Sequence, residues 1–285
     1  PGPDTLFSHG VASGDPTPGA VILWSRVSLD EGDSADVFWE VATDESLEDV
    51  VAAGWAEASG DRDHTLKVDV DGLAPATAYY YRFRCRDVAS VVGRTRTTPD
   101  GPAPRIRFGV GSCSDYTDGT FAAYRELAAR DDLDAVLHLG DYIYEYGNAG
   151  FRAHDPPWTL TKLEDYRTRY AQYRTDPDLQ EAHRRHPFIP IWDDHESANN
   201  AWKGGAPSHI EDALGPWEDR KEEATRAWRE WMPVRETQDG HIYRHLPFGE
   251  LVDLVMSEGG LSQMTDFFDK LQNTHQARMR ELGLA

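Results

Sequence analysis

The chain of 285 residues has few cysteines and little positive charge. Its only cysteines are Cys85 and Cys113, which lie in segments of different character, so a framework of disulfides is not expected. Against 50 aspartates and glutamates there are 29 lysines and arginines, which gives a formal net charge of −21. So acidic a chain offers no broad surface for nucleic acid, because such binding depends on lysine and arginine.

The chain also lacks long apolar runs. No stretch reaches the roughly 18 consecutive apolar residues of a membrane span, and the opening PGPDTLFSHG lacks the basic and apolar regions of a signal peptide. We therefore expect no membrane span and no targeting segment, although a mature exported protein would look the same after cleavage. The content of 39% hydrophobic and 28% charged residues is typical of a globular protein, and the length suits two domains.

Residues 1–98 are predicted to form an all-β domain. Short segments rich in β-branched and aromatic residues, among them AVILWSRV and AYYYRFRC, alternate with Gly, Asp and Pro. Their regular spacing favours a β-sandwich of the immunoglobulin-like kind. One stretch, GLAPATAYYYRFR, resembles the corner of fibronectin type III domains, and Cys85 just after it is interpreted as a small buried hydrophobic residue.

A different pattern follows the Pro- and Gly-rich linker at 99–104. Over residues 105–256, the predicted strands RIRFGVGSC, LDAVLHLGD and FIPIWDDHE alternate with predicted helices. Such alternation indicates an α/β domain with polar residues at the carboxyl ends of its strands.

Helix signals between these strands are clear. Thr161 lies three residues before Glu164 and predicts a capping box, and Asp176 followed by Pro177 predicts the start of the next helix. The tryptophans of a later amphipathic helix are interpreted as core residues: Trp217, Trp228 and Trp231. The histidines interpreted as packing or surface residues are His183, His186, His209, His241 and His245.

Each of the three α/β strands leads into residues that can bind a metal. These residues are Cys113 after the first strand, Asp141 and Tyr144 after the second, and Asp194 and His195 after the third. The carboxyl ends of parallel strands lie side by side, so the groups can converge. A thiolate, a phenolate and a carboxylate together suit a ferric ion, and a carboxylate can bridge to a second ion with oxygen ligands.

The motifs resemble a known family. Residues 140–144 read GDYIY and are similar to the GDxxY motif of purple acid phosphatases, while DDHE stands where calcineurin-like metallophosphoesterases have GN-H-[DE]. Taken with FSHGVASGDPTPGAVILWSRV, SCSDY and WDDHESANN, they resemble the PhoD-type alkaline phosphatases and phosphodiesterases over residues 5–256. The resemblance implies a metallophosphoesterase domain that hydrolyses phosphoesters with a metal-bound hydroxide, at a dinuclear site of Fe3+ and Ca2+ or another divalent ion.

The resemblance also implies a role for each site residue. Cys113 and Tyr144 would bind the ferric ion, and Asp141 would bridge the two ions as a metal ligand and catalytic residue. Asp194 would bind the second ion, and His195 would act catalytically near the leaving group, as an acid or charge stabiliser. The two residues implied to contact the phosphate of the substrate are Asn199 and Asn200.

The pattern changes again after residue 256. The family motif T-G-D-x-H, which supplies a histidine to the second ion, does not occur, and residues 257–285 instead predict an amphipathic helical tail. We therefore expect a shortened metallophosphoesterase domain with a weakly held second ion and low activity. We also expect an exposed sheet edge that favours oligomers.

Three functional hypotheses remain open. The first is hydrolysis of a small-molecule phosphomonoester or phosphodiester. The alternative is a non-catalytic truncated homologue or accessory binding protein, in which the β-sandwich mediates contacts. The third is a nuclease-like diesterase, which the charge of −21 disfavours. Iron, calcium and the family resemblance together favour an extracellular or periplasmic setting.

Overall fold

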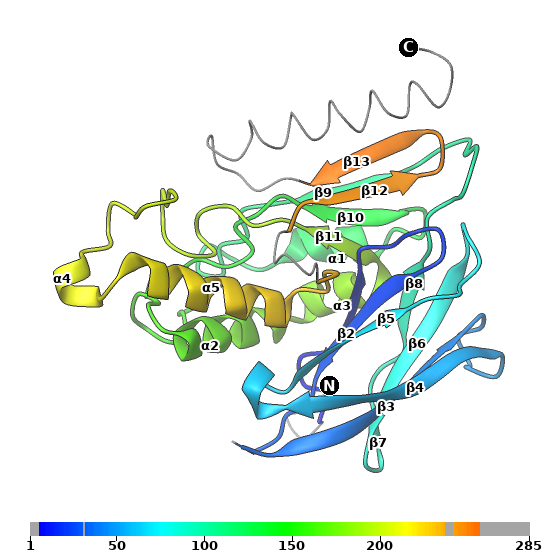
Figure 1. Ribbon diagram of the computed structural model, residues 1–285, viewed down its shortest axis with the longest axis horizontal. Helices are drawn as coiled ribbons and strands as arrows, with labels where there is room; N and C mark the ends of the chain where they lie inside the picture. The colour runs from blue at the N-terminus through cyan, green and yellow to red at the C-terminus, as the bar shows by residue number, and fades with distance from the viewer. Residues whose placement is uncertain (1–5, 31, 237–241, 257–285) are drawn as a thin grey trace.

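The computed structural model describes residues 6–30, 32–236 and 242–256 (Figure 1). The predicted tail at 257–285 lies outside the described residues. The α-helices are α1 Ala122–Ala128, α2 Leu163–Arg174, α3 Pro177–Arg185, α4 Glu211–Leu214 and α5 Trp217–Trp231. The strands are β1 Val11–Gly14, β2 Val21–Arg26, β3 Ser34–Ala42, β4 Val50–Ser59, β5 Thr65–Val70, β6 Ala78–Cys85, β7 Val88–Ala89, β8 Gly93–Arg96, β9 Phe108–Gly111, β10 Ala135–His138, β11 Pro187–Pro190, β12 Arg244–Phe248 and β13 Val252–Met256.

The largest sheet holds the three strands that lead into the predicted site. Its order is β5-β2-β1-β11-β10-β9, and β9, β10 and β11 run parallel as neighbours. Val136 of β10 lies opposite Phe188 of β11, and Ala135 lies opposite Phe108 of β9. The prediction that these strand ends meet at one rim is confirmed. Within the described residues β9 is an edge strand, while the predicted oligomer through an exposed edge stays a prediction.

The six-stranded sheet continues across the linker at 99–104. Strand β1 pairs in parallel with β11, with Ser13 opposite Pro187, and β2 and β5 extend the sheet antiparallel. Strand β2 is buried on both faces because its alternating side chains serve two cores: Leu23 packs in one and Trp24 in the other. The linker therefore does not coincide with a break in the sheet.

A second sheet faces β1, β2 and β5 across the N-terminal core. It has the order β4-β3-β6-β7, with β8 beside β6. Val21 and Leu23 of the first sheet share this core with Val37 and Phe83 of the second. Cys85 is 1% exposed there, which confirms that it is a buried hydrophobic residue. The fibronectin type III assignment stays a prediction.

Helices cover one face of the parallel strands and a hairpin covers part of the other. Helix α3 lies on the face that carries Phe188, where the ring of His183 stacks on it with centroids 3.8 Å apart. The hairpin of β12 and β13 lies against the opposite face, where Phe248 meets Phe108 edge to face at 4.9 Å. Among the described residues, no helix has the length and apolar character needed to cross a membrane.

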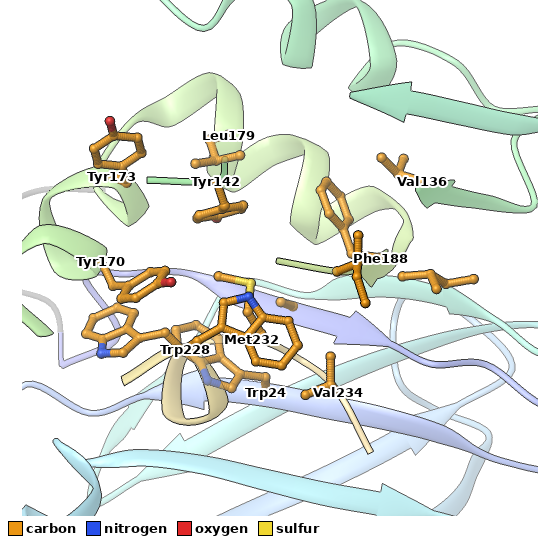
Figure 2. Close-up of a cluster of buried hydrophobic side chains, with 14 of the residues drawn as sticks. Trp24, Val136, Tyr142, Tyr170, Tyr173, Leu179, Phe188, Trp228, Met232 and Val234 are labelled. Carbon is orange, nitrogen blue, oxygen red and sulfur yellow. The ribbon is translucent and has the colours of Figure 1, made fainter. Parts of the chain in front are cut away.

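Helix α5 packs beside α2 and against the sheet (Figure 1). Figure 2 shows Trp228 and Met232 beside Trp24, in the cluster that joins α5 to β2. The Trp24 side chain also donates a hydrogen bond from Nε1 to the carbonyl oxygen of Glu230, at 2.8 Å. All three tryptophans of the helix are buried, which confirms their assignment to the core: Trp217, Trp228 and Trp231.

One helix start differs from its prediction and one agrees. Helix α2 begins at Leu163, one residue later than a box starting at Thr161 would place it, so that prediction was wrong. The Asp165 carboxylate, and not Glu164, reaches back to accept the N–H groups of Thr161 and Lys162, at 3.0 and 3.1 Å. Helix α3 does begin with Asp176 as its N-cap.

Candidate metal centre

Two of the predicted metal ligands lie on strained backbone just after their strands. Cys113 follows β9 with φ of 53°, and Asp141 follows β10 with φ of 52°. Residues other than glycine rarely adopt this left-handed region, and each such residue costs on the order of 1–3 kcal/mol. Strain at these two positions is typical of a functional site.

Gly140 allows the second and third loops to approach each other. Its φ is 97°, and a Cβ placed on it would lie 2.5 Å from the backbone nitrogen of Asp193. The backbone N–H of Cys113 donates to the Gly140 carbonyl oxygen at 3.2 Å, which joins the first loop to the second. A side chain at position 140 would push apart the loops that carry the predicted metal ligands.

The structure brings four of the predicted groups together. The Cys113 thiol donates to Oδ2 of Asp141 at 3.4 Å. Asp141, Asp194 and His195 each offer one potential ligand atom, and these atoms lie within 4.8 Å of one another. Burial raises the pKa of the Asp141 carboxyl, and the nearby Asp193 and Asp194 raise it further, although His195 and Cys113 lower it. A cation would relieve this crowding of negative charge.

Tyr144 lies in the same cluster. Its ring packs at a tilt against that of His195, with centroids 4.2 Å apart. Burial raises the pKa of the Tyr144 phenol, and the charges of Asp141 and Cys113 raise it further. The phenol is therefore protonated at neutral pH unless a strongly polarising cation binds it.

One of the two ring nitrogens of His195 has a hydrogen-bond partner. Nδ1 lies 2.8 Å from Oε2 of Glu145, and the backbone N–H of His195 donates to Oδ1 of Asp141 at 3.4 Å. Burial lowers the pKa of His195, but the hydrogen bond and charge of Glu145 outweigh it, so the pKa is raised. The nearby charges of Asp141 and Asp194 act in the same direction.

Two buried carboxylates of this site were missed by the sequence prediction. Glu145 contacts His195, and Glu196 accepts hydrogen bonds from the backbones of both flanking loops. Glu145 is 1% exposed and Glu196 is 3% exposed. Glu196 stands inside the DDHE motif and Glu145 directly follows GDYIY. Glu145 pairs with His195 and Asn199, and Glu196 pairs with Asp141 and Tyr142, so the motifs alone carried no signal for these contacts between loops.

The two asparagines contribute backbone groups. The N–H of Asn199 donates to Oε1 of Glu145 at 2.7 Å, and that of Asn200 donates to Oδ2 of Asp194. Asn200 also has a left-handed φ of 55° and is exposed. Their contact with a phosphate group stays a prediction.

The other histidines singled out in the sequence do not join the cluster. His186 donates from Nε2 to the carbonyl oxygen of Leu127 at 3.0 Å, and His245 pairs with Asp253 at the surface. Those in the described part of the chain thus have the packing or surface roles predicted: His183, His186, His209 and His245. His241 lies outside the described residues.

The donor set fits metal ions. A thiol, a phenol and two carboxylates at one sheet rim offer the soft and hard donors that a ferric ion and an oxygen-loving divalent ion accept. The buried Asp141 carboxyl lies between the thiol side and the Asp194 side of the cluster, as a bridging ligand must. The identities of the two ions stay predictions.

The fold and these donors define a metallophosphoesterase-like protein. A family model described as "PhoD-like phosphatase" matches residues 108–259, and one described as "PhoD-like phosphatase, N-terminal domain" matches residues 2–99. The chain belongs to the PhoD-like phosphatase family, and the sequence resemblance is confirmed.

Two relatives show how far the similarity extends. Alkaline phosphatase D of Bacillus subtilis (strain 168) is 38% identical over 266 residues, which cover 86% of this chain and 45% of that protein. A solved structure titled "Structure of PhoD" matches with a TM-score of 0.83 and 36% identity, over 90% of this chain and 52% of that chain. This chain therefore spans about half the length of the relatives that it matches.

Proposed function

We propose that the chain hydrolyses small phosphomonoesters or phosphodiesters with the help of two metal ions. Fe3+ would be held by Cys113, Tyr144 and Asp141, and Ca2+ or another divalent ion by Asp141 and Asp194. When bound, two such ions supply Lewis acidity that lowers the pKa of water and offsets the charge of a phosphate. The observation that carries the proposal is the convergence of these donors at the rim of β9, β10 and β11.

The chain's own groups would bind and orient the ester. His195, held at Nδ1 by Glu145, presents its other ring nitrogen for a proton transfer to the leaving oxygen. Asn199 and Asn200 follow on the same loop and would contact the phosphate oxygens with their side-chain amides. General acid catalysis of this kind contributes typically about 10²- to 10⁴-fold in rate.

Charge supports a substrate bound through metal rather than through the protein surface. The net charge of −21 repels phosphate over most of the molecule. The carboxylates of the cluster repel it as well, so a phosphate can enter only once cations neutralise them. A long polyanion such as DNA would meet this repulsion along its whole length, which favours small esters.

The test is an aryl-phosphate assay with elemental analysis of the purified chain. We expect bound iron, a visible charge-transfer band, and hydrolysis that Asp141→Asn lowers at least about 100-fold. A matched control is Asp219→Asn on the exposed side of α5, which keeps the activity. A colourless, iron-free protein with background hydrolysis would contradict the proposal and support the accessory-protein alternative.

The proposed setting is extracellular or periplasmic. This part of the proposal rests on calcium as the second ion, since sites with few protein ligands bind calcium at about 10⁻⁴ to 10⁻³ M, a range that extracellular proteins use. Hydrolysis should therefore rise with added calcium in this range. Saturation below micromolar calcium would argue against the proposed setting.

A further inference from the structure

We infer that Glu145 is a positioning residue that fixes the tautomer and the orientation of His195. This inference deepens the proposed function, because it states which ring nitrogen of His195 faces the substrate. It rests on three consecutive residues, Tyr144, Glu145 and Tyr146, which all contact the His195 ring and which we call the 144–146 cradle.

The two oxygens of Glu145 each have a defined donor. Oε2 lies 2.8 Å from Nδ1 of His195, and Oε1 accepts the backbone N–H of Asn199 at 2.7 Å. Oε2 of Glu145 accepts from Nδ1, so Nδ1 keeps its proton, and Nε2 is the ring nitrogen that takes up and gives off the proton transferred to the leaving oxygen. At 1% exposure, Glu145 has no room to turn towards water, and the pairing is therefore fixed.

The two tyrosines of the cradle restrict the plane of the ring. Tyr144 packs against His195 with the two ring planes tilted by 33°, and Tyr146 meets it edge to face, with centroids 5.2 Å apart and planes at 71°. In-plane rotation is prevented by Glu145, and tilting is prevented by the tyrosines. No hydrogen bond in the described part of the chain occupies Nε2, so Nε2 is the nitrogen left for the substrate.

The role of Glu145 in the cradle differs from that of the proposed metal ligands beside it. Tyr144 is the only member that the resemblance makes a ligand, and the Glu145 carboxylate makes its two contacts with His195 and Asn199. Removing Glu145 should release the ring, which in water prefers a proton on Nε2. The reacting nitrogen would then lose its defined position, and the rate should fall through kcat more than through KM.

The direct test is nitrogen NMR of the full chain labelled in histidine, with calcium present and iron removed so that no signal is broadened. The His195 signal is assigned by its loss in His195→Asn. At a pH high enough for the ring to be neutral, we expect the Nδ1–H form in the unaltered chain and a mixture or the Nε2–H form in Glu145→Ala. The matched control is Glu164→Gln, whose side chain is 78% exposed, and it should leave the signal unchanged. An Nε2–H form in the unaltered chain, or no change in Glu145→Ala, would overturn the inference.

Kinetics give a second and independent measurement. Glu145→Ala should lower kcat about 10- to 100-fold with little change in KM. Glu145→Gln, which keeps an acceptor for Nδ1–H, should recover part of the loss. The double variant Glu145→Ala/His195→Asn should be no slower than His195→Asn alone, because Glu145 acts through His195. Additive losses would refute the role. If the chain hydrolyses nothing, the proposed function fails, while the NMR result still decides the positioning.

Discussion

Glu196 ties two loops of the metal centre together. Its carboxylate accepts the backbone N–H groups of Asp141 at 3.1 Å, Tyr142 at 2.6 Å and Asp193 at 2.8 Å. Burial raises the pKa of Glu196 to about 8, against the effect of the three donors. The side chain thus links the second and third loops.

We predict that Glu196→Gln destabilises the chain by about 2–4 kcal/mol. The amide keeps one acceptor oxygen but turns its NH2 group towards a backbone donor, and each buried donor left unpaired costs about 1–3 kcal/mol. Urea unfolding measures the loss, and calcium titration should show weaker binding. If Glu196→Gln is as stable as the unaltered chain and binds calcium with the same affinity, the two loops are held together by other contacts.

The buried His186 predicts how the stability of the fold depends on pH. Burial, with nearby Arg94 and Arg185, lowers its pKa from 6.5 to about 4, although the bond to Leu127 opposes this. The unfolded chain therefore takes up a proton on this histidine between pH 6.5 and 4 that the folded chain does not. The stability that neutral His186 contributes is present above pH 6.5 and is lost as the pH falls, at up to about 1.4 kcal/mol per unit.

The comparison with His186→Gln isolates this contribution. The variant should be less stable than the parent at pH 7.5, and the difference in unfolding free energy should shrink towards pH 4.5. Urea unfolding at a series of pH values is the measurement. A difference that stays constant with pH would mean that His186 does not titrate as expected.

The convergence of the proposed ligands could be predicted from the sequence, but the residues that hold them in place could not. Cys113, Asp141 and Asp194 follow apolar runs that the sequence marks as strands, so their meeting at one rim follows from the sheet alone. Glu145 and Glu196 act through partners about 50 residues away, on other loops. No local pattern encodes such a contact, because it depends on how two loops pack.

At the scale of the helix and strand, the start of α3 is set by Asp176. Its Oδ1 accepts the N–H groups of Asp178 and Leu179, at 3.0 and 3.1 Å, and its Oδ2 pairs with Arg152 at 2.5 Å. We predict that Asp176→Ala costs about 2–3 kcal/mol, since it removes both the cap and a half-buried ion pair. Thermal unfolding followed by circular dichroism measures this.

The matched variant is Asp176→Asn, which keeps the cap and weakens only the pairing with Arg152. It should lose less than half as much stability as Asp176→Ala. Equal losses in both variants would place the whole effect in the ion pair and none in the cap.

Single elements show where sequence patterns succeed. The Asp-Pro signal at the start of α3 is strong because Asp can accept the first free N–H groups of a helix and Pro fits its first position. Strand β4, Val50–Ser59, was not predicted, because its run of Ala, Gly and Glu lacks β-branched residues after Val51. It forms a strand through its pairing with β3, which is a property of the fold and not of the segment.

At the scale of the whole molecule, contacts across the linker bind the N-terminal strands to the rest. Asp15 is fully buried, pairs with Arg244 at 2.9 Å and accepts the N–H of Arg235 at 2.7 Å. Trp24 joins the sheet to α5 (Figure 2). Because these contacts join the two cores, the stability of each core depends on the packing of the other.

We therefore predict one cooperative unfolding transition. Trp24→Ala should lower the unfolding free energy by about 3–5 kcal/mol and shift this single transition as a whole. Trp55→Ala is the control, since Trp55 is 70% exposed and its loss should cost little. Scanning calorimetry that resolves two transitions, only one of which responds to Trp24→Ala, would contradict the prediction.

The parallel pairing of β1 with β11 bears on how the protein can be cut and recombined. A fragment that begins after the Pro- and Gly-rich linker would lack β1 and leave β11 as an open edge, with the backbone groups opposite Ser13 and Gly14 unpaired. Such a fragment should aggregate even though every proposed metal ligand is retained. An exchange of the first 98 residues between relatives would succeed only where the donor supplies a first strand that matches β11. The junctions of a chimera should therefore be chosen so that β1 and β11 come from the same parent.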